Sequence, residues 1–296
     1  MKLLKVAFFT PLHPQKTGIA DYAEEMLPYL RKYLEIDIFI DGCNPCEEET
    51  IKNHKIYNMD EYEALKDNYD IAVYQMGNNQ FHFKIYEYAL KYPGIVIMHD
   101  FAIHHMVAAI FLDKMKNDTA YFKEVEYNHG LEAGRLAFRR AANGELGLWE
   151  TDAVDYPMNR RLAANSLGII TFSEFAKKRF IDYQIQVPIH RVYLHCGGEC
   201  KEPTEQEILK ARKALKLKLS DDEYLFCVFG FIGPAKRPYS ILEAFNRVIK
   251  AGKKAQLVFV GELQGSCKDL PKMIKKLGLS NKVRLTGFTD INDFKN

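Results

Sequence analysis

The chain has 296 residues, 47% of them apolar, and a formal net charge of only +2 at pH 7. It is long enough to bury two modest cores, and its scattered basic residues give no electrostatic case for nucleic-acid binding. The apolar stretch near the amino terminus is too short for a signal peptide, and no stretch approaches the length of a transmembrane helix.

Six cysteines occur, four of them in the pairs Cys43/Cys46 and Cys196/Cys200. These pairs can be read as the two halves of a zinc site. They lie far apart, however, three residues separate the second pair, and no histidine partner is implied. We therefore favour reduced thiols in a cytoplasmic protein.

The first two thirds of the chain alternate strand patterns with helix patterns, which predicts a parallel sheet. The loop after the first strand ends in Thr17 and Gly18 and leads into an amphipathic helix that contains Asp21. Residues 106–164 carry few strand signals and are expected to form a helical insertion. Strands are expected at residues 5–10, 35–41, 70–75, 94–98, 168–172 and 191–195.

Two titratable residues, His99 and Asp100, directly follow the apolar strand at 94–98. In an open α/β sheet, ligands gather beyond the carboxyl ends of the strands, which makes His99 a candidate site residue. The alternative is a His-Asp pair that only caps the next helix. A metal site built with His104 and His105 is disfavoured, because Asp100 adjoins His99 directly and no water-activating arrangement is apparent.

The most informative stretch is residues 224–249, where an apolar strand leads through a tight turn into an amphipathic helix. The strand at 225–229 is an unbroken apolar run, which is typical of a parallel strand covered on both faces. Gly230 begins the turn, and Gly252 is the expected helix stop.

This turn contains two cations, Lys236 and Arg237, next to the start of the helix. Free backbone N–H groups and the positive end of the helix dipole favour phosphate at such a place. The spacing matches neither the dinucleotide fingerprint nor the Walker A loop. The alternative is a solvated Lys-Arg pair beside an ordinary turn.

Residues 230–245, together with 256–262 and 282–288, resemble the start of the donor-binding domain of family 4 retaining glycosyltransferases. The resemblance implies an α/β protein with two Rossmann-like domains that face each other across a cleft, the GT-B fold. In many members an Arg follows the first Gly of the turn, and a Lys comes several residues later. Lys236 matches that Lys, whereas Phe231 stands at the Arg position, which leaves Arg237 as a substitute.

The amino-terminal part resembles the other domain of this family. The loop that ends at Gly18 resembles the glycine loop near the donor phosphates, and His99 resembles the active-site histidine. The resemblance thus implies donor contacts by Gly18, Gly230, Lys236 and Arg237, a catalytic role for His99, and acceptor or sugar contacts by Thr17, Asp21 and Asp100. It also implies that the donor is bound without a metal and that no cofactor is needed.

On this basis, residues 1–218 form an acceptor-side domain with the helical insertion at 106–164, and residues 219–296 form part of the donor-binding domain. A complete donor domain would carry roughly as many residues again. The second domain is therefore expected to be incomplete, and the chain to be a truncated part of an enzyme that is inactive by itself.

The implied function is a hexosyltransferase-type activity in polysaccharide biosynthesis. A sugar would move with retention from a nucleoside diphosphate sugar to a hydroxyl of a glycan or lipid-linked acceptor. A sugar-nucleotide epimerase of the same architecture and a non-catalytic nucleotide-binding module are the alternatives. Peripheral membrane contact through Lys177, Lys178 and Arg179 is a weaker expectation, and a solvated helix face is its alternative.

Overall fold

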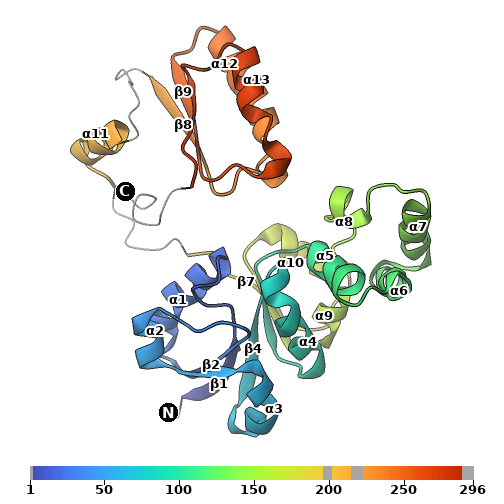
Figure 1. Cartoon of the computed structure of the whole chain (residues 1–296). Coiled ribbons are helices and arrows are strands. Elements are labelled where there is room, and N and C mark those ends of the chain that lie inside the picture. Colours follow the sequence, from blue (N-terminus) through green and yellow to red (C-terminus); the bar gives the residue numbers. More distant parts are fainter. Residues whose placement is uncertain (1–2, 196–201, 215–222, 289–296) are drawn as a thin grey trace. The chain divides into compact units, whose positions relative to one another are not determined.

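The structure is a computed structural model that describes residues 3–195, 202–214 and 223–288 (Figure 1). The chain divides into two compact units, Met1–Glu199 and Cys200–Asn296, and each is described by itself. Helix α11 (Glu205–Ala214) lies in the second unit. The predicted domain limits at residues 218 and 219 stay a prediction.

The first unit is built on a seven-stranded parallel sheet, as its alternating strand and helix patterns predict. The strand order is β3-β2-β1-β4-β5-β6-β7, so the order reverses between β1 and β4. Such a switch point is where sheets of this class bind ligands, beyond the carboxyl ends of the strands. The strands are β1 (Leu4–Phe9), β2 (Leu34–Ile40), β3 (Lys55–Asn58), β4 (Ile71–Met76), β5 (Ile95–Met98), β6 (Gly168–Thr171) and β7 (Ile189–Arg191).

Helices cover both faces of this sheet, because its strands carry apolar side chains on both sides. Val6 and Phe8 of β1 belong to the apolar cluster on which α1 packs. Ala7 and Phe9 belong to the opposite cluster, to which α4 and α5 contribute. The helices of this unit are α1 (Gly18–Leu30), α2 (Glu48–Asn53), α3 (Tyr62–Leu65), α4 (Phe83–Lys91), α5 (His104–Ala108), α6 (Asp118–His129), α7 (Leu131–Ala142), α8 (Leu148–Thr151), α9 (Arg160–Asn165) and α10 (Glu174–Asp182).

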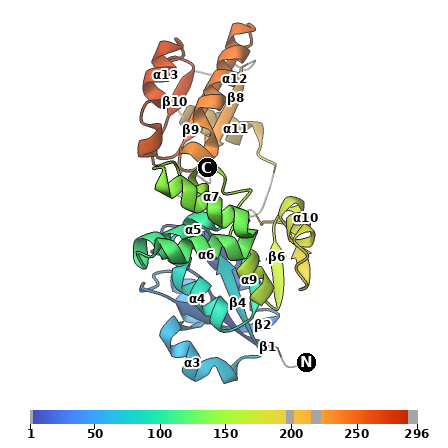
Figure 2. The ribbon, with the colours of Figure 1, turned by 90° about the vertical axis from the view of Figure 1, so that its right-hand side faces the viewer.

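The chain between β5 and β6 is helical, as expected for the insertion at 106–164. Helix α5 continues directly into a π-helical turn, Ala109–Lys114. Helices α6 and α7 pack against each other, and Figure 2 shows them side by side. Gly130, with a φ of 88°, joins these two helices, and Gly144, with a φ of 68°, follows the end of α7. Both glycines allow backbone turns that other residues rarely adopt.

Two strands of the first unit differ from the sequence-based expectation. β3 was not expected, because the segment Lys55–Asn58 is short and half polar, and it pairs with β2 alone at the edge of the sheet. β7 spans Ile189–Arg191 rather than residues 191–195. Its neighbour β6 ends at Thr171, opposite Arg191, so residues 192–195 have no described strand beside them.

The second unit contains a three-stranded parallel sheet with the order β10-β9-β8. Every residue of the central strand β9 is buried. The expectation that β8 is covered on both faces is wrong, since Tyr224, Phe226 and Phe229 are exposed. β8 has a neighbouring strand on one side only within the described sheet. The elements are β8 (Tyr224–Phe229), α12 (Pro238–Lys250), β9 (Ala255–Val260), α13 (Leu270–Lys276) and β10 (Val283–Leu285).

Candidate functional site

Three loops meet at the carboxyl end of the sheet in the second unit, and each contains a glycine with a positive φ. Gly230 follows β8 and donates its N–H to the carbonyl of Val260, at 2.9 Å. Gly261 forms an isolated β-bridge with Gly287 after β10. A β-carbon on Gly261, where φ is 143°, would lie 2.1 Å from the carbonyl oxygen of Gly230. Only glycine fits there, and the close approach fixes the first loop against the second.

Lys236 and Arg237 lie at the start of α12, as the strand-turn-helix pattern predicts. The Lys236 side chain folds back toward Gly230, where a β-carbon would lie 3.7 Å from the Lys236 Nζ. Arg237 has a φ of 48° and is the N-cap residue of this 13-residue helix. Within the described residues neither cation forms a salt bridge, and both side chains are exposed. The turn therefore presents two free positive charges beside a helix N-terminus, a suitable environment for a phosphate.

In the first unit, His99 lies just beyond the carboxyl end of β5. Its Nε2 atom is hydrogen-bonded to the side-chain oxygen of Gln75, which belongs to the neighbouring strand β4. Its ring packs edge-on against Tyr22 of α1, with 4.8 Å between ring centroids, and against Phe172, at 5.0 Å. The imidazole is thus held by three elements that are far apart in the sequence.

The surroundings of His99 favour its uncharged form. Burial lowers the pKa of His99 to about 3, and the nearby imidazoles of His82 and His195 act in the same direction. His195 itself packs on the Tyr22 ring, with 4.4 Å between centroids, and lies 3.2 Å from a carboxylate oxygen of Glu25. At neutral pH the His99 ring can therefore accept or donate a hydrogen bond without carrying a charge.

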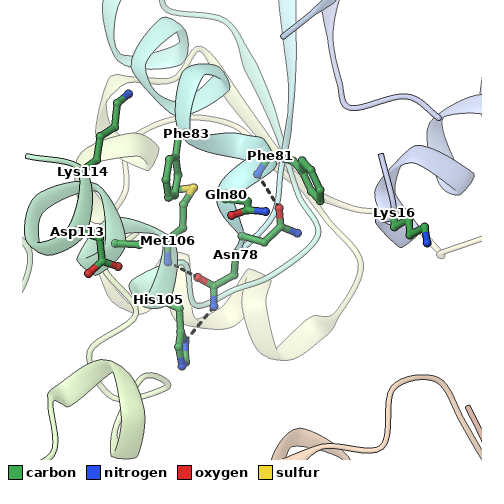
Figure 3. A pocket seen from close by; sticks show the side chains of 11 residues that line it. Lys16, Asn78, Gln80, Phe81, Phe83, His105, Met106, Asp113 and Lys114 are labelled. Carbon is green, nitrogen blue, oxygen red and sulfur yellow. Dashed lines mark hydrogen bonds between the residues drawn. The ribbon is translucent and has the colours of Figure 1, made fainter. Parts of the chain in front are cut away.

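Asp100 holds a neighbouring loop rather than capping the next helix. Its carboxylate accepts the backbone N–H of Asn78, in the loop after β4, at 2.9 Å. The Asn78 side chain in turn accepts the N–H of Met106 at 2.9 Å and lies 3.3 Å from the His105 Nδ1 (Figure 3). Asn78 therefore joins the two loops that follow β4 and β5.

The predicted residues of the first loop serve the start of α1. The hydroxyl of Thr17 accepts the N–H of Ile19 at 3.4 Å, so Thr17 is the N-cap residue of α1. The carboxylate of Asp21 is 3.0 Å from the Nε2 of His13. A β-carbon on Gly18 would meet no atom within 4 Å, so open space lies at that position.

A pocket of about 630 Å³ lies beside Asn78 in the first unit (Figure 3). Asn79, Gln80 and His105 supply polar groups to its wall, and the π-helical turn adds Asp113 and Lys114. Two phenylalanines contribute flat apolar faces. The full lining is Lys16, Asn78, Asn79, Gln80, Phe81, Phe83, His105, Met106, Ala109, Asp113 and Lys114.

The predicted site residues thus fall into two groups. Gly230, Lys236 and Arg237 lie together in the second unit, and Thr17, Gly18, Asp21, His99 and Asp100 lie at the carboxyl edge of the first sheet. Sequence reasoning missed Gln75, Tyr22 and Asn78. The available signal was a polar side chain at the end of an apolar strand, which Gln75 and Asn78 provide and Tyr22 does not.

The described residues contain no group of three or more His, Cys, Asp or Glu side chains placed to hold a metal ion. Cys43 and Cys46 are free thiols, and the other half of the alternative zinc site, Cys196 and Cys200, lies outside the described residues. None of the described helices combines the length and the apolar character that crossing a membrane requires.

Comparison with known proteins finds a family model that matches the end of the chain and solved structures that share its fold. Residues 210–296 match the family model described as "Glycosyl transferases group 1". This match supports the predicted resemblance and includes the Gly230 turn and α12. Assignment to the retaining family 4 stays a prediction. Among proteins with curated functions, none matches the chain.

Solved glycosyltransferase structures resemble nearly the whole chain. A glycosyltransferase from Rickettsia africae has a TM-score of 0.58 at 13% identity, over 98% of this chain and 69% of that one. Alr3699/HepE from Anabaena, in complex with UDP and glucose, has a TM-score of 0.53 at 14% identity, over 97% and 70%. WaaG, a glycosyltransferase involved in lipopolysaccharide biosynthesis, has a TM-score of 0.50 at 12% identity, over 97% and 71%. These likenesses confirm the predicted GT-B fold class.

Proposed function

We propose that this chain belongs to a hexosyltransferase that moves a sugar, with retention and without a metal, from a nucleoside diphosphate sugar to a hydroxyl group. The observation that carries the proposal is that the family match at residues 210–296 contains the exposed cations of the Gly230 turn. The fold shared with the Anabaena protein, which was crystallised with UDP and glucose, supports the same substrate class.

The second unit would bind the diphosphate of the donor. One further negative charge develops on the diphosphate as its bond to the sugar breaks, and Lys236 and Arg237 are exposed and can neutralise it. The first-turn N–H groups of α12 add donors of fixed orientation. Interactions that strengthen as the charge develops lower the barrier rather than only tightening ground-state binding.

The first unit would bind the sugar and the acceptor. The neutral ring of His99 suits a hydroxyl of the transferred sugar, because a charged imidazolium would instead attract the diphosphate. The pocket beside Asn78 suits the acceptor, because amides and the Asp113 carboxylate bind hydroxyl groups while the Phe81 and Phe83 faces cover the C–H surface of a sugar ring. Gly18, Thr17 and Asp21 would line the space near the donor phosphates and acceptor.

The acceptor is proposed to be a glycan or a lipid-linked sugar that the enzyme meets in the cytoplasm. Of the basic cluster on α10, Arg179 is directed inward: its guanidinium lies 5.9 Å from the Phe101 ring and 5.5 Å from the Tyr183 ring. Lys177 and Lys178 are the charges left for anionic headgroups. Flotation with anionic liposomes at low and high salt tests this contact, and binding that is unaffected by salt would contradict it.

The donor site is tested by titrating UDP-sugars into the purified protein by calorimetry. Lys236→Ala should weaken binding about ten- to a hundredfold, the range expected for a lost charge-assisted hydrogen bond. Arg237→Gly removes the second charge while keeping the left-handed backbone, and we expect a smaller loss. Lys250→Ala, at the other end of α12, is the matched control. Equal affinities in Lys236→Ala and the control would overturn the donor site.

Transfer is tested by incubating UDP-sugars with and without glycan acceptors. His99→Ala should lower the rate of transfer while leaving the affinity for UDP alone unchanged, since the His99 role concerns the sugar. Conversion of the donor sugar to its epimer without any acceptor would instead indicate the epimerase. If the protein binds the nucleotide but neither converts the donor sugar nor transfers it to any of the acceptors, the non-catalytic module is favoured.

A further inference from the structure

Gln75 is fully buried at the carboxyl end of β4, directly beside the proposed catalytic histidine. Its backbone carbonyl accepts a hydrogen bond from the His82 Nδ1 at 3.0 Å. Its side-chain oxygen faces the His99 Nε2, and the His99 backbone N–H is bonded to the neighbouring carbonyl of Met76, at 2.9 Å. Both the main chain and the ring of His99 are therefore fixed to the end of β4.

The Gln75 amide makes an asymmetric set of contacts. Its oxygen is used by His99, whereas its buried Nε2 has no hydrogen-bond partner among the described residues. A buried amide donor without a partner destabilises the folded chain. Hydrophobic side chains of similar size would avoid that cost, so a polar residue here suggests a function that requires the oxygen.

The contact determines which ring nitrogen of His99 carries hydrogen. In the observed orientation of the amide, its oxygen accepts a hydrogen bond from the Nε2 that faces it, and in a neutral ring Nδ1 is then the acceptor. Among the described residues, no group is hydrogen-bonded to this Nδ1. Unlike the Gln75 Nε2, it is not one of the completely buried side-chain atoms that have no partner. This Nδ1 is therefore not fully enclosed by the described residues.

We propose that Gln75 is a positioning residue that holds His99 as the neutral Nε2–H tautomer and presents the Nδ1 lone pair to a hydroxyl of the sugar substrate. The assignment of that hydroxyl to a sugar rests on the proposed function. The tautomer of His99 does not rest on the proposed function, so an experiment can contradict the tautomer and the sugar contact independently.

The groups around the ring are consistent with this role. Tyr22 from α1 and Phe172 after β6 pack on it without offering a charge, and the His82 ring is hydrogen-bonded to the Gln75 backbone carbonyl. His195, paired with Glu25, is the remaining titratable neighbour. A carboxylate in place of the Gln75 amide would be the one negative charge in direct contact with Nε2.

The tautomer is measured by NMR of protein labelled with ¹⁵N-histidine, with the His99 signals identified by their loss in His99→Ala. In the unsubstituted protein we expect Nε2–H signals that stay unchanged between pH 8 and pH 5. Gln75→Met keeps the volume but removes the oxygen, so the two tautomers should mix. The opposite tautomer in the unsubstituted protein, or the same tautomer in Gln75→Met, would overturn the proposal. If Gln75→Met fails to fold, the unsubstituted spectrum still decides.

Gln75→Glu gives the sharper functional result, because a carboxylate beside Nε2 favours the imidazolium. We expect His99 to titrate between pH 5 and pH 8 in this variant and transfer to fall about tenfold from pH 8 to pH 6 if its midpoint lies near pH 7. Gln186→Glu, an exposed position elsewhere in the first unit, is the charge control and should show neither change. A His99 in Gln75→Glu that still does not titrate would contradict the contact. A His99 Nδ1 signal that does not shift with saturating UDP-sugar would exclude the role toward the sugar.

Discussion

The two units place their polar groups in opposite environments. In the first, burial removes the charge from His99, and a buried amide fixes its ring. In the second, Lys236 and Arg237 are exposed, and they follow a turn whose backbone is fixed by glycines. All nine histidines of the chain lie before residue 196, so the second unit has none. The buried histidines are therefore confined to the first unit, and we expect mild acid to destabilise the first unit more than the second.

The largest expected effect is an acid-induced loss of stability confined to the first unit. Burial lowers the pKa of His82 and His129 to about 4, and of His99 and His104 to about 3. Below pH 6.5 the unfolded chain therefore binds more protons than the folded one, and the free energy of unfolding falls by up to about 1.4 kcal/mol per pH unit for each histidine. Trp149, the single tryptophan, reports this unit by fluorescence.

Urea unfolding monitored at Trp149 should move to clearly lower urea between pH 7 and pH 5. Hydrogen exchange of the β9 amides reports the second unit and should change much less over the same range. A Trp149 transition at the same urea concentration at both pH values would contradict the proposed burial of these rings.

A smaller effect, confined to the second unit, is expected for Gly261→Ala. The added methyl group would collide with the carbonyl of Gly230 at a φ that other residues rarely adopt, so we expect a loss of about 2–3 kcal/mol and weaker donor binding. Protection of the β9 amides against hydrogen exchange is the measurement. Gly265→Ala is the matched control, because a β-carbon there meets no atom within 4 Å. Equal losses in the two variants would show that the contact with Gly230 is unimportant.

The smallest effect has the opposite pH dependence and concerns His13. Burial alone would lower the pKa of His13, but the carboxylates of Glu24 and Asp21 more than offset it, so the pKa is raised. The stabilisation is therefore complete below about pH 6.5 and is lost as the pH rises through the raised value. His13→Gln should cost less than about 1 kcal/mol at pH 6 and still less at pH 9.

Thermal unfolding at the two pH values tests the His13 prediction, with the exposed His190→Gln as the control. A His13→Gln difference that grows from pH 6 to pH 9 would contradict the ion pair. It would also remove the contrast with the four histidines that burial keeps neutral.

The sequence predicted those parts of the fold that depend on local pattern. The strands that begin at Leu4, Ile71 and Ile95 are mostly apolar and mostly buried, and such runs can be recognised from the sequence alone. β3 was missed because its place at the sheet edge needs little apolar surface. The exposure of β8 was missed because the residues of a strand do not indicate how many strands lie next to it in the sheet.

In the candidate sites, too, the sequence predicted what depends on local pattern and missed what depends on contacts between distant segments. Lys236 was found because strand, turn and helix follow one another within one stretch of sequence. The contact of His99 with Gln75 was missed because it depends on β4 and β5 being neighbours in the sheet, which is a property of strand order. Tyr22 was missed for a similar reason, since it reaches the histidine from α1.

The π-helical turn at Ala109–Lys114 extends α5 and changes the helical phase of the last side chains before its C-cap residue, Met115. A π turn holds one residue more than the α-helical turn it replaces, so each later side chain is rotated by about 100° relative to an uninterrupted helix. Asp113 and Lys114, which lie at the end of this turn, line the pocket beside Asn78. Deleting a single residue from the turn would restore the α-helical phase and turn both side chains toward a new direction. The chemistry of this wall can thus be altered by changing the length of the chain while its side chains stay the same.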